Sequence, residues 1–108
     1  MLVQIWREIN MTNEDLQKLE ESKRRVFKRT FGDEYGVNLV ELRLWKNNDG
    51  RELGQINCTI CETMTAMEIG EMCRKMAKWL GGELYGTVNL DYSDETSPSI
   101  EMMAEREL

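Results

Sequence analysis

Residues 36 to 60, GVNLVELRLWKNNDGRELGQINCTI, decide the fold, because two alternating stretches flank the segment Asn47-Asn48-Asp49-Gly50. An Asp-Gly pair between alternating segments predicts a β-hairpin, since the turn needs positive φ angles that glycine adopts without strain. The alternation of apolar and polar residues is typical of strands with one buried face. We therefore expect antiparallel strands at residues 37–46 and 51–60.

A helix is predicted on each side of this hairpin. Residues 13–31 carry apolar side chains at helical spacing after Thr12, which with an acidic residue three positions on resembles a capping box, and this helix should end near Gly32. The second helix should start after Thr65, where Glu68 completes a full capping box, and should end at the glycine pair 81–82.

Two further strands are expected at residues 2–9, LVQIWREI, and at residues 83–92, ELYGTVNLDY. The order β-α-β-β-α-β is the ferredoxin-like plan, an α+β fold with a four-stranded antiparallel sheet and two helices on one face. We expect residues 1–92 to form this single domain. Residues 93–108 should be an acidic C-terminal extension, with a short helix opened by Pro98. The plan hosts many unrelated functions and predicts none of them.

Composition narrows the class of protein. The chain has 108 residues, of which 41% are hydrophobic and 31% charged, as in a folded single domain. It has no apolar run near the roughly 20 residues that span a bilayer, and its first residues lack the pattern of a secretory signal. We therefore expect a cytoplasmic protein that does not act at a membrane. Histidine is absent, which removes the commonest general base, and no catalytic residue is nominated.

All three cysteines lie in the stretch CTICETMTAMEIGEMC, residues 58 to 73. Cys58 shares its strand parity with Ile56 and Ile60, and Cys73 lies on the apolar stripe of the second helix, so both should be core residues. A zinc site needs four ligands, usually cysteine or histidine, and a redox C-x-x-C starts a helix, whereas this one precedes the cap. No metal and no other cofactor is predicted.

The sheet face away from the helices is the most suggestive surface. If Val40, Leu42 and Leu44 face the helices, Arg43 and Trp45 lie on the other face, with aromatic residues of the neighbouring strands. Tryptophan, tyrosine and arginine are enriched at protein interfaces. Two alternatives stay open: the C-terminal segment folds over this face, or two copies of the chain bury it in a homodimer.

The net charge of −6 is concentrated at the C-terminal end, because residues 83–108 carry one basic and seven acidic side chains. Our hypothesis is a small, acidic, non-catalytic interaction module that binds another protein, in its most specific form an inhibitor or adaptor in the basic nucleic-acid-binding cleft of a nucleic-acid-handling enzyme. Phage-encoded anti-defence proteins, including anti-CRISPRs, are an analogy of kind and not of sequence. The candidate protein-binding residues are Trp6, Arg43, Trp45, Tyr85, Asp91, Asp94, Glu95, Glu101 and Glu105.

Two rival hypotheses remain. A nucleic-acid-binding or regulatory domain would use the basic cluster of the first helix, Lys23, Arg24, Arg25, Lys28 and Arg29, together with the aromatic residues of the sheet. Cationic residues near a helix C-terminus also favour the helix dipole, and an acidic protein is a poor general binder of nucleic acid, so this partner is disfavoured. The third hypothesis is a small-molecule enzyme with a cleft on the sheet face, for which no nucleophile or base can be named.

Overall fold

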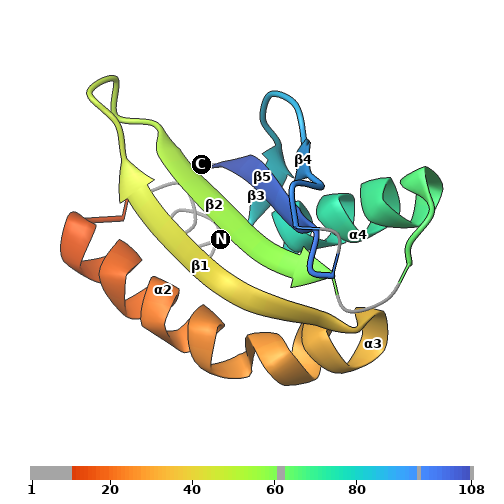
Figure 1. Ribbon diagram of the computed structural model, residues 1–108. Helices are drawn as coiled ribbons and strands as arrows, with labels where there is room; N and C mark the ends of the chain where they lie inside the picture. The colour runs from red at the N-terminus through yellow and green to blue at the C-terminus, as the bar shows by residue number, and fades with distance from the viewer. Residues whose placement is uncertain (1–10, 61–62, 95, 108) are drawn as a thin grey trace.

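The computed structural model describes residues 11–60, 63–94 and 96–107 (Figure 1). They form a mixed α+β fold, in which the main helices cover one face of an open antiparallel sheet of five strands. The buried apolar residues of both layers form one core cluster. No helix in the described ranges is long and apolar enough to cross a membrane.

Helix α2 (Asn13–Phe27) begins with the predicted capping box. The hydroxyl of Thr12 accepts a hydrogen bond from the backbone N–H of Asp15 (3.1 Å), and the Asp15 carboxylate accepts one from the N–H of Thr12 (3.2 Å). The helical path continues through a π-helical stretch, η1 (Lys28–Gly32), and a last turn, α3 (Asp33–Tyr35). The predicted end near Gly32 is therefore too early. The chain leaves the helix at Gly36, whose φ of +66° favours glycine.

The predicted hairpin is confirmed as strands β1 (Val37–Lys46) and β2 (Glu52–Ile60). Gly50 has a φ of +80°, and the side chain of Asn47 accepts hydrogen bonds from two backbone N–H groups of the turn, at 2.9 and 3.0 Å. The register shifts between Leu39 and Glu41, which leaves Val40 as an extra residue. Val40 was expected on the buried face, but this β-bulge leaves it 61% exposed.

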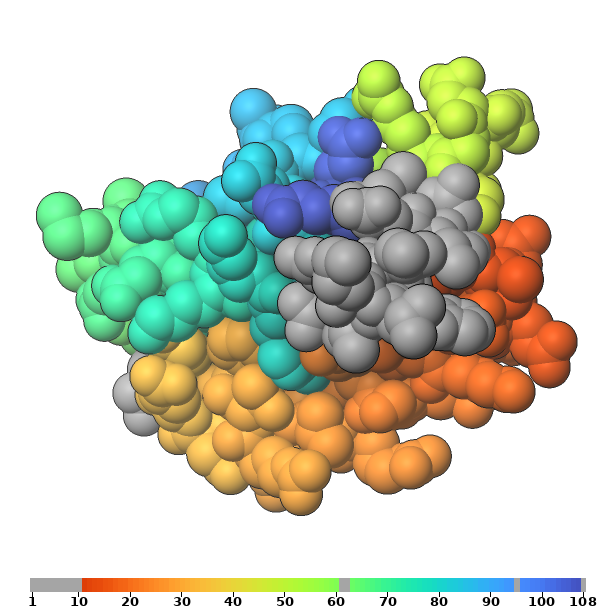
Figure 2. Space-filling view, turned by 180° about the vertical axis from the view of Figure 1, so that it is seen from behind, coloured from red at the N-terminus to blue at the C-terminus, as the bar shows by residue number. Residues whose placement is uncertain are grey.

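Helix α4 (Ala66–Trp79) is also confirmed, with its capping box and with Gly81 at a φ of +94°. Both helices lie on the same face of the sheet, as the view from behind shows (Figure 2). They meet through Trp79, whose ring centroid lies 6.1 Å from that of Phe27 and 5.2 Å from that of Phe31, both in edge-on geometry. Such aromatic pairs stabilise the contact beyond the area that they bury.

The strand predicted at residues 83–92 is present in two short pieces, β3 (Gly82–Leu84) and β4 (Asn89–Asp91). Gly86, with a φ of +73°, lies in the break between them. Both pieces pair with the same neighbour, β5 (Ser99–Arg106), along one of its edges. They act as one interrupted edge strand.

Strand β5 is the main correction to the predicted fold. The short helix expected after Pro98 is a strand instead, and it lies inside the sheet, whose order is β1-β2-β5-β3 with β4 also on β5. Ile100, Met102 and Ala104 are at most 1% exposed, so the real period of this segment is two. Ile100, Met103 and Ala104 also fit a helical spacing, and this ambiguity of a short segment misled the prediction. The ferredoxin-like order and the four-strand count are not confirmed, and the strand expected at residues 2–9 lies outside the described residues.

The described chain consists of two α-β-β units, α2-β1-β2 and α4-β3/β4-β5, joined at the sheet centre by the antiparallel pair of β2 and β5. A short sequence similarity accompanies this repeat: YGVNL at residues 35–39 leads into β1, and YGTVNL at residues 85–90 leads into β4. The glycine of each copy has a similar positive φ, +66° at Gly36 and +73° at Gly86. In the first unit this glycine ends the helical segment before β1, and in the second it lies in the break between β3 and β4.

A buried ion pair fastens the two units together at one end of the sheet. Glu52 of β2 is 2% exposed, and its carboxylate lies 3.0 Å from Nε of Arg106 in β5. Arg106 also donates to the carbonyl oxygen of Leu80, and Glu52 accepts from the backbone N–H of Met11 (2.9 Å). The pair thus connects both central strands with the end of α4 and the start of α2.

We expect Arg106→Ala to lower the free energy of unfolding by about 3 kcal/mol, because it leaves the Glu52 carboxylate buried without its cation. Urea unfolding followed by circular dichroism measures this loss. Arg51→Ala is the matched control, since Arg51 lies 3.5 Å from Glu105 with half-exposed side chains and its loss should cost under about 1 kcal/mol. Equal losses for the two variants would contradict this role of the buried pair.

Candidate functional site

The candidate site is the sheet face that lies opposite the two helices. Here strand register brings together side chains from three strands in cross-strand rows. We call this surface the acidic sheet face and define it by three rows: Trp45, Leu53 and Glu105; Arg43, Gln55 and Met103; Glu41, Asn57 and Glu101. Directly opposed side chains in such rows lie about 5 Å apart at Cβ, so each row is a continuous strip of surface.

Trp45 supplies an aromatic side chain to the acidic sheet face. It is half-buried, and the guanidinium carbon of Arg43 lies 5.3 Å from the centroid of its ring. Leu53, its partner in the register, is only 7% exposed and does not belong to the core cluster between sheet and helices. The cation–π contact and the packing on Leu53 hold the indole in place, which reduces the entropy that a binding partner would have to overcome.

Carboxylates outnumber guanidinium groups on this surface. Glu41 lies 3.7 Å from Arg43, and Glu105 lies 3.5 Å from Arg51 at the rim. Both pairs are solvent-exposed and therefore weak, so they can rearrange when a partner arrives. Glu101 has no ion pair with a described residue. The face thus carries a net negative charge, with its carboxylates in the two rows on either side of the Arg43 row.

Tyr85 and two aspartates lie along the β3–β4 margin of this face. Tyr85 is 43% exposed, and its backbone N–H donates to the carbonyl oxygen of Met103 (2.9 Å), which places it at the end of the Arg43 row. Asp91 pairs with Ser99 in the ladder, and Asp94 lies in the turn that follows. Hydrogen bonds from Ser93 and from Thr96, respectively, lower the pKa of these two carboxyl groups. Both therefore remain anionic to below their usual titration range.

The structure places most of the predicted protein-binding residues on one surface. Arg43, Trp45, Glu101 and Glu105 share the acidic sheet face, with Tyr85, Asp91 and Asp94 along its margin. Trp6 and Glu95 lie outside the described residues. The alternative in which the C-terminal segment folds over this face is wrong for residues 99–106, which form a strand within the sheet.

Five residues of this face are absent from the predicted set of protein-binding residues, namely Glu41, Leu53, Gln55, Asn57 and Met103. Met103 was missed because a helix was predicted after Pro98. The alternation of Ile100, Met102 and Ala104 was the available signal for a strand. Nothing in the sequence marks Leu53 as buried on this face.

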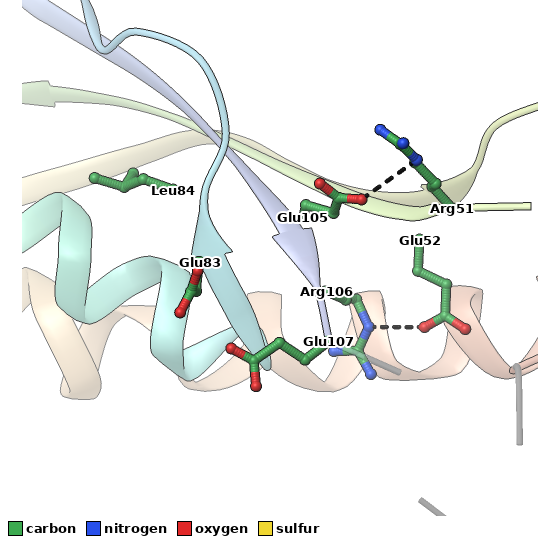
Figure 3. Close-up of a pocket in the computed structure, with 7 residues that line it drawn as sticks. All are labelled: Arg51, Glu52, Glu83, Leu84, Glu105, Arg106 and Glu107. Carbon is green, nitrogen blue, oxygen red and sulfur yellow. Dashed lines mark hydrogen bonds and ion pairs between the residues drawn. The ribbon is translucent and has the colours of Figure 1, made fainter. Parts of the chain in front are cut away.

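A pocket of about 360 Å³ opens at the end of the sheet (Figure 3). Its lining residues are Arg51, Glu52, Glu83, Leu84, Glu105, Arg106 and Glu107. Figure 3 shows the two ion pairs on opposite sides of the strands, Arg51 with Glu105 and Arg106 with Glu52. Two of the four glutamates in this lining, Glu52 and Glu105, are thus ion-paired with arginine.

The residues of the basic cluster, in α2 and η1, make different contacts. Lys23 lies over the ring of Trp79, 4.6 Å from the centroid, and burial there lowers the pKa of its ammonium group. Arg24 donates to the carbonyl oxygen of Leu42 (3.0 Å) and lies 3.2 Å from Glu20. Arg25, Lys28 and Arg29 are exposed and form no ion pair with a described residue. The surface available to phosphates is therefore smaller than the sequence suggests.

The prediction that two cysteines are core residues is confirmed. Cys58 of β2 and Cys73 of α4 are 0% exposed and reduced. Burial raises the pKa of Cys58 to about 12 and that of Cys73 to about 11. Both thiols are therefore protonated and unreactive at neutral pH. Cys61 lies outside the described residues. The described residues contain no group of three or more histidine, cysteine or carboxylate side chains that could hold a metal ion.

We expect neither Cys58 nor Cys73 to react with iodoacetamide at pH 8 while a Cys61→Ser variant is folded, because a buried thiol is neither ionised nor accessible. Both should be alkylated in concentrated urea, as mass spectrometry will show. The pKa of each thiol is higher in the folded protein than in an unfolded chain, so burial of the protonated thiols stabilises the fold. This contribution to the free energy of unfolding is complete below about pH 9 and is lost as the pH rises toward 11–12. Rapid labelling of the native protein would contradict the core assignment.

Comparisons with known proteins assign the chain to no family. No protein-family model, curated protein or solved structure matches the chain significantly. The function has to be argued from the surfaces described above.

Proposed function

We propose that this chain is a non-catalytic interaction module that binds a basic surface of another protein through the acidic sheet face. The observation that carries the proposal is the one-sided packing of the sheet, with both helices on one face and Trp45 held in a carboxylate-rich surface on the other. A sheet face that no described helix covers, and that carries aromatic and charged side chains, has the composition of a protein interface.

The charge of this face supports a basic partner. Glu41, Glu101 and Glu105 lie on it, and Asp91 and Asp94 lie at its margin with lowered pKa values. Rows of carboxylates attract lysine and arginine over distances of about a Debye length, roughly 8 Å at physiological ionic strength. Such a surface speeds the encounter with a basic cleft and disfavours acidic partners.

The apolar residues of the face support a specific contact. Trp45 is the expected hot spot, because tryptophan dominates binding energies when it is surrounded by residues that exclude water. Met103 lies in the adjacent row, and Tyr85 lies at the end of that row. The face therefore combines an anchor with a charged surround.

In its most specific form, the proposal is an inhibitor or adaptor that occupies the nucleic-acid-binding cleft of its partner. Carboxylates on a rigid sheet offer lysine and arginine the negative charge that phosphates otherwise provide. Phage anti-defence proteins, including anti-CRISPRs, act in this manner, and the likeness is one of charge and size.

A triple variant, Glu41→Gln/Glu101→Gln/Glu105→Gln, tests the electrostatic part of the proposal. Immobilised wild-type protein should retain a basic, nucleic-acid-handling protein from a lysate of the native host, and the variant should bind that protein at least about tenfold more weakly, which corresponds to about 1.4 kcal/mol. Isothermal titration calorimetry with the purified partner gives the ratio. Glu14→Gln/Glu21→Gln/Glu71→Gln is the control, since it removes the same charge from exposed positions of the helices.

Three further outcomes decide between the hypotheses. Trp45→Ala should weaken the same complex, and nucleic acid added in excess should compete with the module for its partner. Unchanged affinity of the triple variant would contradict the proposal. Direct binding of the protein to nucleic acid at low salt, lost in Arg25→Ala/Lys28→Ala/Arg29→Ala, would favour the rival hypothesis. Light scattering that shows a dimer dissociated by Trp45→Ala would mean that a second copy occupies the face.

A further inference from the structure

The two outer edges of the sheet, β1 and β3, differ in whether described residues form hydrogen bonds to their outward backbone groups. On β1, the register directs the backbone groups of Leu42 and Leu44 outward. Nε of Arg24 donates to the carbonyl oxygen of Leu42 (3.0 Å), and the carboxylate of Glu20 accepts from the N–H of Leu44 (2.8 Å). Two helical side chains thus occupy the hydrogen-bonding positions that another strand would use, which protects this edge.

The edge at β3 has no such protection in the described part of the chain. The backbone bonds Tyr85 N–H to Met103 and Glu107 N–H to Gly81 fix the pattern of the ladder with β5. In an antiparallel ladder hydrogen-bonded pairs alternate with non-bonded pairs, so the N–H and C=O groups of Gly82 and Leu84 point away from β5. No hydrogen bond from another described residue reaches them.

A groove runs beside these unsatisfied groups. It has a volume of about 330 Å³ and lies between α4 and β3, with Arg74, Lys78, Gly82, Glu83 and Leu84 as its lining. Figure 2 shows α4, in teal, beside the cyan segment that follows it. Gly82 cannot be replaced by a larger residue here, since an added Cβ would lie 1.9 Å from the carbonyl oxygen of Glu105.

The charges of the groove select the kind of partner. Arg74 and Lys78 are exposed, one helical turn apart, and neither forms an ion pair with a described residue. Lys75 lies between them in the sequence. Its ammonium group forms ion pairs with Glu34 and Glu71 and donates a hydrogen bond to the hydroxyl of Tyr35. Two cations beside an open strand edge suit an extended segment that carries a carboxylate.

We propose that the β3 edge is a second binding site, which takes an extended acidic peptide as an additional strand with its carboxylate between Arg74 and Lys78. The site lies on the helix side of the sheet and is separate from the acidic sheet face. Main-chain hydrogen bonds to Gly82 and Leu84 would supply the affinity, and the two cations would supply the preference for an acidic residue. A second copy of the chain fits this edge poorly, because a symmetric β3–β3 pair would bring the two Glu83 carboxylates together.

The test uses a synthetic peptide, acetyl-Thr-Val-Glu-Val-Thr-amide, titrated into the full-length protein and followed by amide NMR. We expect the signals of Gly82 and Leu84 to shift in a saturable manner with a dissociation constant of about a millimolar or better. The glutamine analogue of the peptide should bind at least about tenfold more weakly. Arg74→Ala/Lys78→Ala should weaken binding of the glutamate peptide by the same factor. Arg25→Ala/Lys28→Ala, on exposed positions of α2 and η1, should leave its binding unchanged.

N-methylated peptides test the strand pairing without altering the protein. Only alternate peptide N–H groups can face β3, so methylation of one alternate set should abolish binding and methylation of the other should not. Which set is sensitive reports whether the added strand is antiparallel or parallel. Equal effects of both patterns, absence of binding, or light scattering that shows β3-mediated dimers without peptide would each overturn the proposal. The outcome is independent of the acidic sheet face, because no variant used here changes it.

Discussion

The antiparallel pairing of β2 with β5 is the constraint on which the rest of the structure depends. It joins two α-β-β units that would otherwise each expose one edge and one side of a small core. Ile56 of β2 faces Met102 of β5 in the register, and both are almost fully buried under the helices. The ion pair between Glu52 and Arg106 fixes the same two strands at their end. A break in this pairing would separate the halves of the core, since each helix packs mainly on the strands of its own unit.

One-sided packing follows from this arrangement and creates the candidate site. Both helices lie on the same face, where Trp79 of α4 packs against Phe27 of α2 and Phe31 of η1. The opposite face is stabilised by cross-strand pairs, among them Trp45 with Leu53, and by the contact of the Arg43 guanidinium with the Trp45 ring. The same features that stabilise an uncovered face also preorganise it for binding.

The two units of the repeat have diverged at their outer edges. In the first unit, Glu20 and Arg24 of α2 close the edge of β1 with side-chain hydrogen bonds. In the second, α4 presents Arg74 and Lys78 beside a short edge strand, and among the described residues neither side chain bonds to the backbone of that strand. A lysine or arginine could donate to a strand carbonyl, as Arg24 does, but it cannot accept from a strand N–H as Glu20 does.

Local signals in the sequence determined both main helices, the hairpin and the burial of Cys58 and Cys73, because capping boxes, an Asp-Gly turn and strand parity act over a few residues. They also determined that Arg43 and Trp45 share a face. Only the tertiary structure decided the place of residues 99–106, since a strand and a helix both fit so short an apolar pattern and pairing with β2 selects the strand. It alone decided the exposure of Val40, which depends on a bulge, and the uses of Lys23 and Arg24, which depend on Trp79 and on the β1 edge. Long-range register, which no local pattern encodes, is the physical reason for the difference.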